Sequence, residues 1–247
     1  MADITGTPMI SDTDLYTSSA IASSVYSVGD CVAGTKGRKY RYVLAGDTAL
    51  VKGNLLQEAA IDTTYTNMAI GTAGVAGDNY LQVTNGTATI TTAQFAGGTV
   101  GVYTAGTIAV GDEYVITKVT GTLTTGGALK VWLDRPLRSA VTTSAKVNMR
   151  RSMWSGVIQF PTTQTGVPVG VAIFDIPLGE YGWVLTHGEC TVLSDGSTFA
   201  VGSSISSGSS TAGAVSVGSV ATTDCFIGYA RQIAAATKGI AAFIKID

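Results

Sequence analysis

The chain has 247 residues and carries 15 Lys and Arg against 17 Asp and Glu, so its formal net charge is −2. Only 13% of its residues are charged, about half the usual share, whereas 45% are hydrophobic and 31 are Gly. This apolar content argues against an intrinsically disordered protein, and the length is sufficient for a proper core. The near-balance of charges gives no general reason to bind nucleic acid.

Further protein classes are disfavoured by the cysteine spacing and by particular segments. The cysteines, Cys31, Cys190 and Cys225, are far apart and form no CxxC pair, which argues against a disulfide scaffold and a structural zinc site. The first residues, MADITGTPMISDTD, lack the basic and apolar regions of a signal peptide. The most apolar stretch, 166–174, falls short of the roughly 20 residues of a membrane span. We therefore expect a soluble protein made in a reducing cytoplasm.

Beta-branched and aromatic residues recur in short runs separated by Gly, Asp, Asn, Ser and Thr, which is typical of strands and turns. In chain order this pattern predicts strands at 39–45, 79–84, 88–91, 99–104, 113–121, 128–133, 155–160, 167–174, 181–188, 190–194, 226–233 and 239–246. Helix-forming sequence is confined to short pieces at 53–60 and 91–96. The sequence therefore predicts an all-β protein.

A polar and relatively basic segment, 138–156, separates two strand-rich halves and indicates a domain boundary. We expect an extended N-terminal arm at 1–14, a β-rich domain at 15–150 and a second at 155–247, each like a β-barrel or β-sandwich. Within the second domain, the Ser/Gly-rich stretch 194–219 is predicted to form a short strand and a long exposed loop.

Four Gly-Asp pairs recur before predicted strands, at residues 29–30, 46–47, 77–78 and 111–112. Gly adopts positive φ angles and Asp bonds to nearby backbone, so the pair is suited to closing a turn. A calcium loop would need several carboxylates within one segment, and no segment supplies them. We expect turns at these pairs rather than metal sites.

The segment EYGWVLTHGECTVLSDG, residues 180–196, contains the single histidine of the chain. His187 lies close in sequence to Glu189 and Cys190, a combination that also occurs in hydrolase centres. On a strand, however, His187 and Glu189 point to one face and Cys190 to the other. We expect a bend at Gly188 between two strands, and we predict no catalytic, cofactor-binding or metal-binding residues and no enzymatic activity.

Three other kinds of site remain open as weaker alternatives. The carboxylates available for glycoside hydrolysis are Asp112, Glu113, Asp175, Glu180 and Glu189. The aromatic pairs Tyr181/Trp183 and Tyr40/Tyr42 are compatible with a sugar-stacking platform, although we favour a core or a subunit seam. The basic residues Lys36, Arg38, Lys39 and Arg41 alternate with Tyr40 and Tyr42, which is compatible with a small basic and aromatic face, although we favour the solvated side of a strand; Arg150 and Arg151 are a separate basic pair.

Several motifs of the second half resemble the capsid decoration (cement) proteins and related head proteins of tailed bacteriophages. They are the Tyr-Gly-Trp-Val strand at 181–184, Thr-Ala-Gly-Ala-Val at 211–215, and the Ile-Gly-x-Ala hairpin at 227–230 that closes on a C-terminal aliphatic strand. In the first half, GTKGRKYRYVLAGDTALVKGNLLQ (34–57) and the stretch from 112 to 137 look like the entry strands and later β-ladder of such proteins.

This resemblance implies a structural virion protein without a cofactor, located on the outer capsid surface. Its expected partners are the major capsid protein and further copies of itself, as a homotrimer, with neither a membrane nor nucleic acid bound directly. The low charge of the chain agrees with permanent association, because a free monomer usually carries mixed charges over its surface. The alternative is a carbohydrate-binding head fibre or tail adhesin, in which the 194–219 loop and the aromatic residues contact a host glycan.

Overall fold

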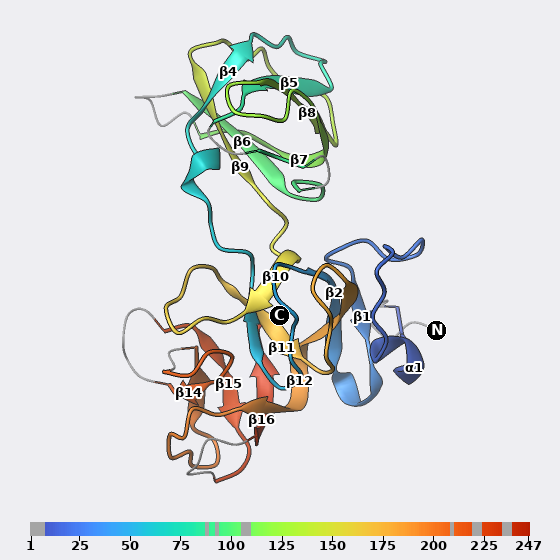
Figure 1. Cartoon of the computed structure of the whole chain (residues 1–247), viewed down its shortest axis with the longest axis vertical. Helices are drawn as coiled ribbons and strands as arrows, with labels where there is room; N and C mark the ends of the chain where they lie inside the picture. Colours follow the sequence, from blue (N-terminus) through green and yellow to red (C-terminus); the bar gives the residue numbers. More distant parts are fainter. Residues whose placement is uncertain are drawn as a thin grey trace. The chain divides into compact units, whose positions relative to one another are not determined.

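The computed structural model describes residues 8–86, 89–91, 94–104, 110–207, 210–218, 224–233 and 239–247. The chain forms two compact units (Figure 1). Residues 61–152 form one, here called the barrel unit, and residues 1–60 together with 153–247 form the other, here called the sheet unit. Both units consist of β-strands with short helical turns, so the predicted all-β class is confirmed. None of the helices in the described ranges has the length and apolar character needed to cross a membrane.

The barrel unit is a closed barrel with the strand order β4-β5-β8-β7-β6-β9. Alternation of apolar and polar residues sends one side of each strand into the interior, where Val83, Val119 and Val131 are fully buried. A short 3-10 helix, η2 (Thr63–Tyr65), precedes the first strand. The strands are β4 (Met68–Thr72), β5 (Tyr80–Thr84), β6 (Thr99–Thr104), β7 (Val110–Gly121), β8 (Ala128–Leu133) and β9 (Ala145–Arg150).

The sheet unit contains a ten-stranded sheet with the order β1-β2-β10-β3-β11-β12-β16-β15-β13-β14. A further antiparallel pairing between β2 and β12 joins two strands that are not neighbours in this order. The strands are β1 (Cys31–Ala33), β2 (Lys39–Ala45), β3 (Leu55–Gln57), β10 (Ser155–Gln159), β11 (Pro168–Ala172), β12 (Tyr181–Leu193), β13 (Ser204–Ser206), β14 (Ser216–Val217), β15 (Phe226–Ala230) and β16 (Gly239–Lys245). The longest strand, β12, therefore pairs with β2, β11 and β16.

The sheet unit buries two apolar clusters. One contains Val43, Leu56 and Val184, each fully buried. The other is larger and includes Trp183, Phe199 and Ile244, together with residues from the N-terminal part of the unit. Because Phe199 and Ile205 belong to this second cluster, much of the predicted Ser/Gly-rich loop is packed rather than exposed. Residues 208–209 and 219 of that stretch lie outside the described residues.

The N-terminal segment is not an extended arm where the structure describes it, which corrects the prediction for residues 8–14. Met9 forms a parallel bridge with Ala33, and Ile10 is buried at 9% exposure. Ser11 caps a short helix, α1 (Asp12–Leu15), and Leu15 is packed in the larger core cluster. Apolar side chains hold this segment against the rest of the unit through tertiary contacts. Local sequence periodicity does not predict such contacts. Residues 1–7 lie outside the described residues.

The structure also divides the chain differently from the predicted domains 15–150 and 155–247. A transition near residue 152 is present, but residues up to 60 belong with the second half. Strand β2 pairs with β12 along most of its length, from Tyr181 opposite Leu44 to His187 opposite Lys39. Long-range pairing of this kind decides which residues share a domain. The chain passes between the two units near residue 60 and again near residue 152, and linker composition indicates only the second boundary.

Several elements differ locally from the prediction. The helix-forming stretch 53–60 instead contains strand β3, because Leu55 and Leu56 are buried in the two core clusters of the sheet unit. The predicted linker 138–156 contains strand β9, whose alternating Ala145, Val147 and Met149 enter the barrel interior. No strand covers residues 89–91, and residues 94–97 form a turn; neighbouring residues 88, 92 and 93 lie outside the described part. A short 3-10 helix, η1 (Thr35–Gly37), joins β1 to β2.

The Gly-Asp pairs form turns at two of the positions that the sequence indicated. Gly29 and Gly77 have φ angles of +99° and +98°, which favour glycine. The carboxylates of Asp30 and Asp78 accept hydrogen bonds from the backbone N–H of Ser27 and Val75, respectively. Gly111 and Asp112, by contrast, lie within strand β7.

Candidate functional site

The segment that contains His187, Glu189 and Cys190 is one continuous strand, β12, so the predicted bend at Gly188 is wrong. Gly188 has a φ of +110° within the strand, where β12 pairs with β16. A Cβ added at Gly188 would lie 2.9 Å from Cγ of Arg38 and 3.2 Å from its Cα. Glycine is required here because the strand is distorted and because Arg38 packs directly on the bare backbone.

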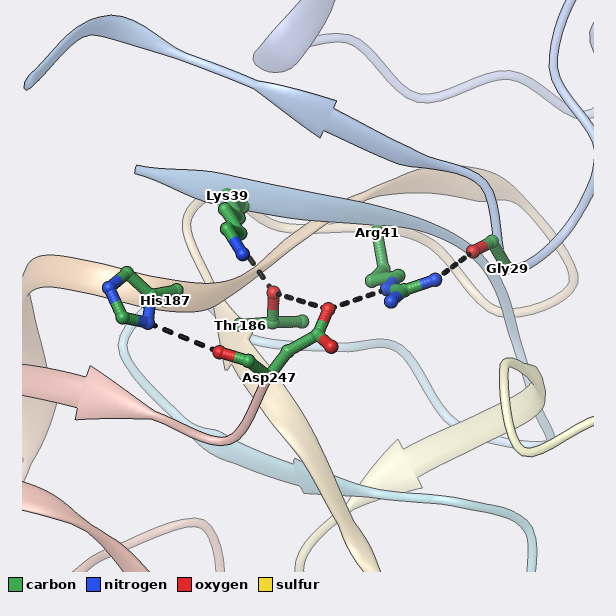
Figure 2. Close-up of polar contacts among 6 residues, drawn as sticks. All are labelled: Gly29, Lys39, Arg41, Thr186, His187 and Asp247. Carbon is green, nitrogen blue, oxygen red and sulfur yellow. Dashed lines mark hydrogen bonds and ion pairs between the residues drawn. The ribbon is translucent and has the colours of Figure 1, made fainter. Parts of the chain in front are cut away.

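His187 belongs to a polar cluster around Asp247 (Figure 2). Its Nδ1 lies 3.1 Å from the main-chain oxygen of Asp247, and its ring contacts Phe243 edge-on at 5.1 Å between centroids. The Asp247 carboxylate accepts a hydrogen bond from Arg41 Nε at 2.7 Å, and Arg41 also donates to the main-chain oxygen of Gly29. These contacts join β2, β12 and the segment after β16.

Protonation of Asp247 is expected to weaken this cluster. The hydrogen bond from Arg41 lowers the pKa of the Asp247 carboxyl, and the charge of Lys39 acts in the same direction. Because the pKa is lower in the folded state, the stabilisation is present above about pH 4 and is lost as pH falls through the lowered value. We expect Asp247→Asn to cost about 1 kcal/mol at pH 7, a modest figure since the side chain is 29% exposed.

This cost is measured by chemical denaturation of the wild type and of Asp247→Asn between about pH 7 and pH 2. The difference in the free energy of unfolding is expected to shrink toward acid pH. A matched control is Asp195→Asn, because the Asp195 side chain accepts a hydrogen bond from the Ser197 N–H and forms no ion pair within the described residues. A cost for Asp247→Asn that stays constant across the pH range would refute the role of the Arg41 ion pair.

Glu189 and Cys190 lie on the same strand but do not cooperate with His187. Glu189 forms an ion pair with Arg231, which follows strand β15. The Cys190 side chain packs against the larger core cluster, and burial raises the pKa of its thiol to about 12. The thiol is therefore protonated at neutral pH and is a poor nucleophile. The three residues are each engaged by a different neighbour.

A cavity of about 460 Å³ lies beside this part of β12, within the sheet unit. Leu185, Val192 and Ile173 provide apolar walls, and Arg38, Lys52 and Glu189 are the charged residues at its lining. The cavity is large enough for a small molecule or a side chain of a partner. Glu189 and Cys190 both line it, but Glu189 is paired with Arg231 and burial keeps the Cys190 thiol protonated, and Glu189 is the single carboxylate of the described lining. Nowhere in the described ranges do three His, Cys, Asp or Glu residues gather as metal ligands.

The other carboxylates considered from the sequence have structural partners, except that the side chain of Glu113, exposed on strand β7, has none among the described residues. Asp112 pairs with Arg138 and accepts a hydrogen bond from Tyr114 in the barrel unit. In the sheet unit, two carboxylates hold neighbouring segments in place: Asp175 accepts from the backbone N–H of Lys52, and Glu180 accepts from the hydroxyl of Ser18. These contacts fix turns and strand ends.

The aromatic pairs on β2 and β12 form part of the core. Trp183 is 3% exposed, and its ring lies 5.0 Å from Tyr42 and 4.9 Å from Tyr26. Tyr42 also stacks on Tyr181 at 5.8 Å. Since Tyr40 is buried as well, these rings provide no open stacking platform. Lys39 and Arg41 alternate with the buried tyrosines of β2, in agreement with the sequence pattern.

Comparison with known proteins adds no family to these observations, because no family model, no curated protein and no solved structure matches the chain. The sequence pattern does not mark Asp247 or the exposed aliphatic residues of the N-terminal segment as functional candidates. A search for sequence motifs does not find Asp247, because its partners lie on β2 and β12, far from it along the chain.

Proposed function

We propose that the chain is a capsid decoration (cement) subunit of a tailed bacteriophage, which binds the outer surface of the shell and stabilises it. The proposal rests on the resemblance of residues 181–184, 211–215 and 227–230 to such proteins. The protein acts as a structural component of the virion, assembled with the major capsid protein and with copies of itself as a homotrimer. The proposal assigns it no enzymatic activity.

The observation that carries a docking role is the exposure of large aliphatic side chains on an anchored segment, residues 16–28, here called the strap. Ser19 forms an antiparallel bridge with Tyr181, and Tyr26 packs on Trp183. Between these anchors, Ile21 and Val25 are 79% and 76% exposed. Burial of such side chains by a partner is favourable, and the existing anchors reduce the ordering cost of binding.

A third exposed aliphatic side chain belongs to the segment that the strap contacts. Leu178, which is 64% exposed, lies in the turn before β12. The nearby Glu180 accepts a hydrogen bond from Ser18 of the strap. A partner that covers the strap therefore meets aliphatic side chains from two segments held together by main-chain and side-chain bonds. In the proposed role the protein binds the assembled shell, and a ligand that binds only the assembled state stabilises that state by mass action.

The test uses capsid shells assembled from the major capsid protein of the same genome. Purified protein is mixed with shells, and bound copies are counted after sedimentation. We expect saturable binding by the wild type and a loss of at least tenfold in affinity for Ile21→Ser/Val25→Ser, since each replacement removes about 1–2 kcal/mol of apolar burial. Light scattering of the free protein measures the expected trimer.

The matched control is Ile61→Ser/Val75→Ser, which alters two aliphatic residues of similar exposure, 67% and 62%, in the barrel unit. It is expected to bind as the wild type does. If neither the wild type nor the control binds shells, the decoration role is wrong. If the strap variant binds as well as the wild type, the protein docks through another surface.

A further inference from the structure

The outer face of strands β5, β8 and β7 in the barrel unit combines aromatic and cationic side chains. Tyr80 pairs with Trp132 across β5 and β8, and Lys118 of β7 pairs with Trp132 on its other side. The neighbouring residues Leu81 and Val131 are buried in the barrel, so these three side chains project outward. The two rings are 5.3 Å apart at an interplanar angle of 46°, and both are partly exposed.

Two lysines of this face have aromatic rather than acidic partners. Lys118 Nζ lies 5.0 Å from the centroid of the Trp132 ring, and Lys130 Nζ lies 4.9 Å from that of Tyr80. Both lysines are exposed, and neither takes part in an ion pair found in the described ranges. Cation–π contacts at exposed sites are weak, so each ammonium remains available to an anionic ligand.

The strand neighbours of Lys130 do not neutralise its charge. The residues registered beside Lys130 are Gln82 on β5 and Thr120 on β7, both uncharged. The carboxylate of Asp134, next to the strand end, accepts a hydrogen bond from the backbone N–H of Val115. Residues 61–152 hold seven Lys and Arg against five Asp and Glu, a net charge of +2, whereas the rest of the chain holds eight against twelve, a net charge of −4.

We propose that this face, defined by Tyr80, Trp132, Lys118 and Lys130, binds an acidic polysaccharide. The apolar C–H face of a sugar ring packs on an aromatic ring, and a uronate carboxylate pairs with a lysine ammonium. The indole N–H of Trp132 donates a hydrogen bond to Thr120 Oγ1 at 2.9 Å, which fixes the ring for binding. The rings and cations are thus arranged before the ligand arrives.

The density of charge favours an acidic sugar over nucleic acid. A sequence-independent grip on nucleic acid requires several cations along one face, because every nucleotide carries a phosphate. This face offers two lysines separated by aromatic and uncharged positions. A polymer with spaced carboxylates and apolar ring faces matches that composition more closely.

The experiment measures binding of an oligogalacturonate of about eight residues to the full chain by titration calorimetry. We expect binding that weakens with added salt, and a loss of about tenfold or more for Lys118→Ala/Lys130→Ala and for Trp132→Ala. The matched control, Lys36→Ala/Lys245→Ala, removes the same charge from exposed lysines of the sheet unit and is expected to bind normally. Circular dichroism verifies the fold, and the lysine variant retains both rings of the Tyr80–Trp132 contact.

Two comparison ligands make the proposal refutable. The fully methyl-esterified oligogalacturonate keeps the sugar rings without their charge and is expected to bind at least tenfold more weakly. Equal binding of the ester, or tighter binding of an eight-nucleotide oligothymidylate, would overturn the acidic-sugar assignment. Absence of binding by the wild type would also overturn it. Because no capsid is used, the result is independent of the decoration role.

Discussion

Replacement of Trp183 by alanine is expected to lower the free energy of unfolding of the sheet unit by about 3–5 kcal/mol. Trp183 is 3% exposed and stands opposite Tyr42 in the β2–β12 ladder. Its ring contacts both Tyr42 and Tyr26, so truncation leaves a cavity and removes two aromatic contacts at once. The affected pairing holds the N-terminal part of the chain to its C-terminal half.

Chemical denaturation followed by circular dichroism measures this cost, with each unit's transition fitted separately if two are resolved. Trp183→Phe keeps a ring in the same place and is expected to cost less than the alanine variant. Trp132→Ala is a useful comparison, because Trp132 is partly exposed and its removal is expected to cost only about 1 kcal/mol. A loss below about 1 kcal/mol for Trp183→Ala would contradict its place in the core.

Gly188→Ala is expected to destabilise the sheet unit by about 3 kcal/mol, the second largest effect. The φ of +110° at this position is unfavourable for any residue with a Cβ, at a cost of about 1–3 kcal/mol. The new methyl group would also crowd Arg38, whose Cα is 3.2 Å from the added Cβ. The backbone of Arg38 cannot move away without disturbing the start of β2 beside it.

Two comparisons separate the backbone cost from the crowding. Gly179→Ala also introduces a Cβ at positive φ, +71°, but the added atom has no neighbour within 4 Å, so we expect only about 1 kcal/mol. Combining Arg38→Ala with Gly188→Ala relieves the contact with the Arg38 side chain and is expected to recover part of the loss. Equal losses for Gly179→Ala and Gly188→Ala would show that crowding by Arg38 contributes nothing.

The accuracy of the strand predictions follows the strength of the local pattern. Strands 39–45, 99–104 and 128–133 match β2, β6 and β8 at both ends, because their runs of β-branched, aliphatic and aromatic residues are bounded by sequences that contain turn-forming Gly, Asp or Pro. Short strands such as β3 have too few residues to show a period, so the local sequence there favours a helix instead. At Gly188 the sequence favours a bend, since glycine often ends strands, whereas the packing of Arg38 requires a glycine inside one.

At the candidate site, too, the local sequence predicts some features and long-range contacts decide the others. Alternation along β12 is sufficient to separate Cys190 from His187 and Glu189, because neighbouring side chains of a strand point to opposite faces. The partners that engage His187 and Glu189, Asp247 and Arg231, are 60 and 42 positions away along the chain, so local sequence does not reveal them. Local sequence likewise does not reveal that Lys118 lies beside Trp132, because the pairing of β7 with β8 in the barrel brings them together.

The sequence by itself determined the all-β class, most strand positions and the placement of the tyrosines and the basic residues Lys39 and Arg41 on opposite sides of β2, because these depend on a two-residue period. Only the tertiary structure decided that the N-terminal residues up to 60 belong with the second half, since pairing between β2 and β12 is a long-range contact. It also decided which aromatic residues are buried, as with Trp183, and which are partly exposed, as with Trp132. Exposure depends on what lies against a strand, and a residue pattern along one strand does not contain that information.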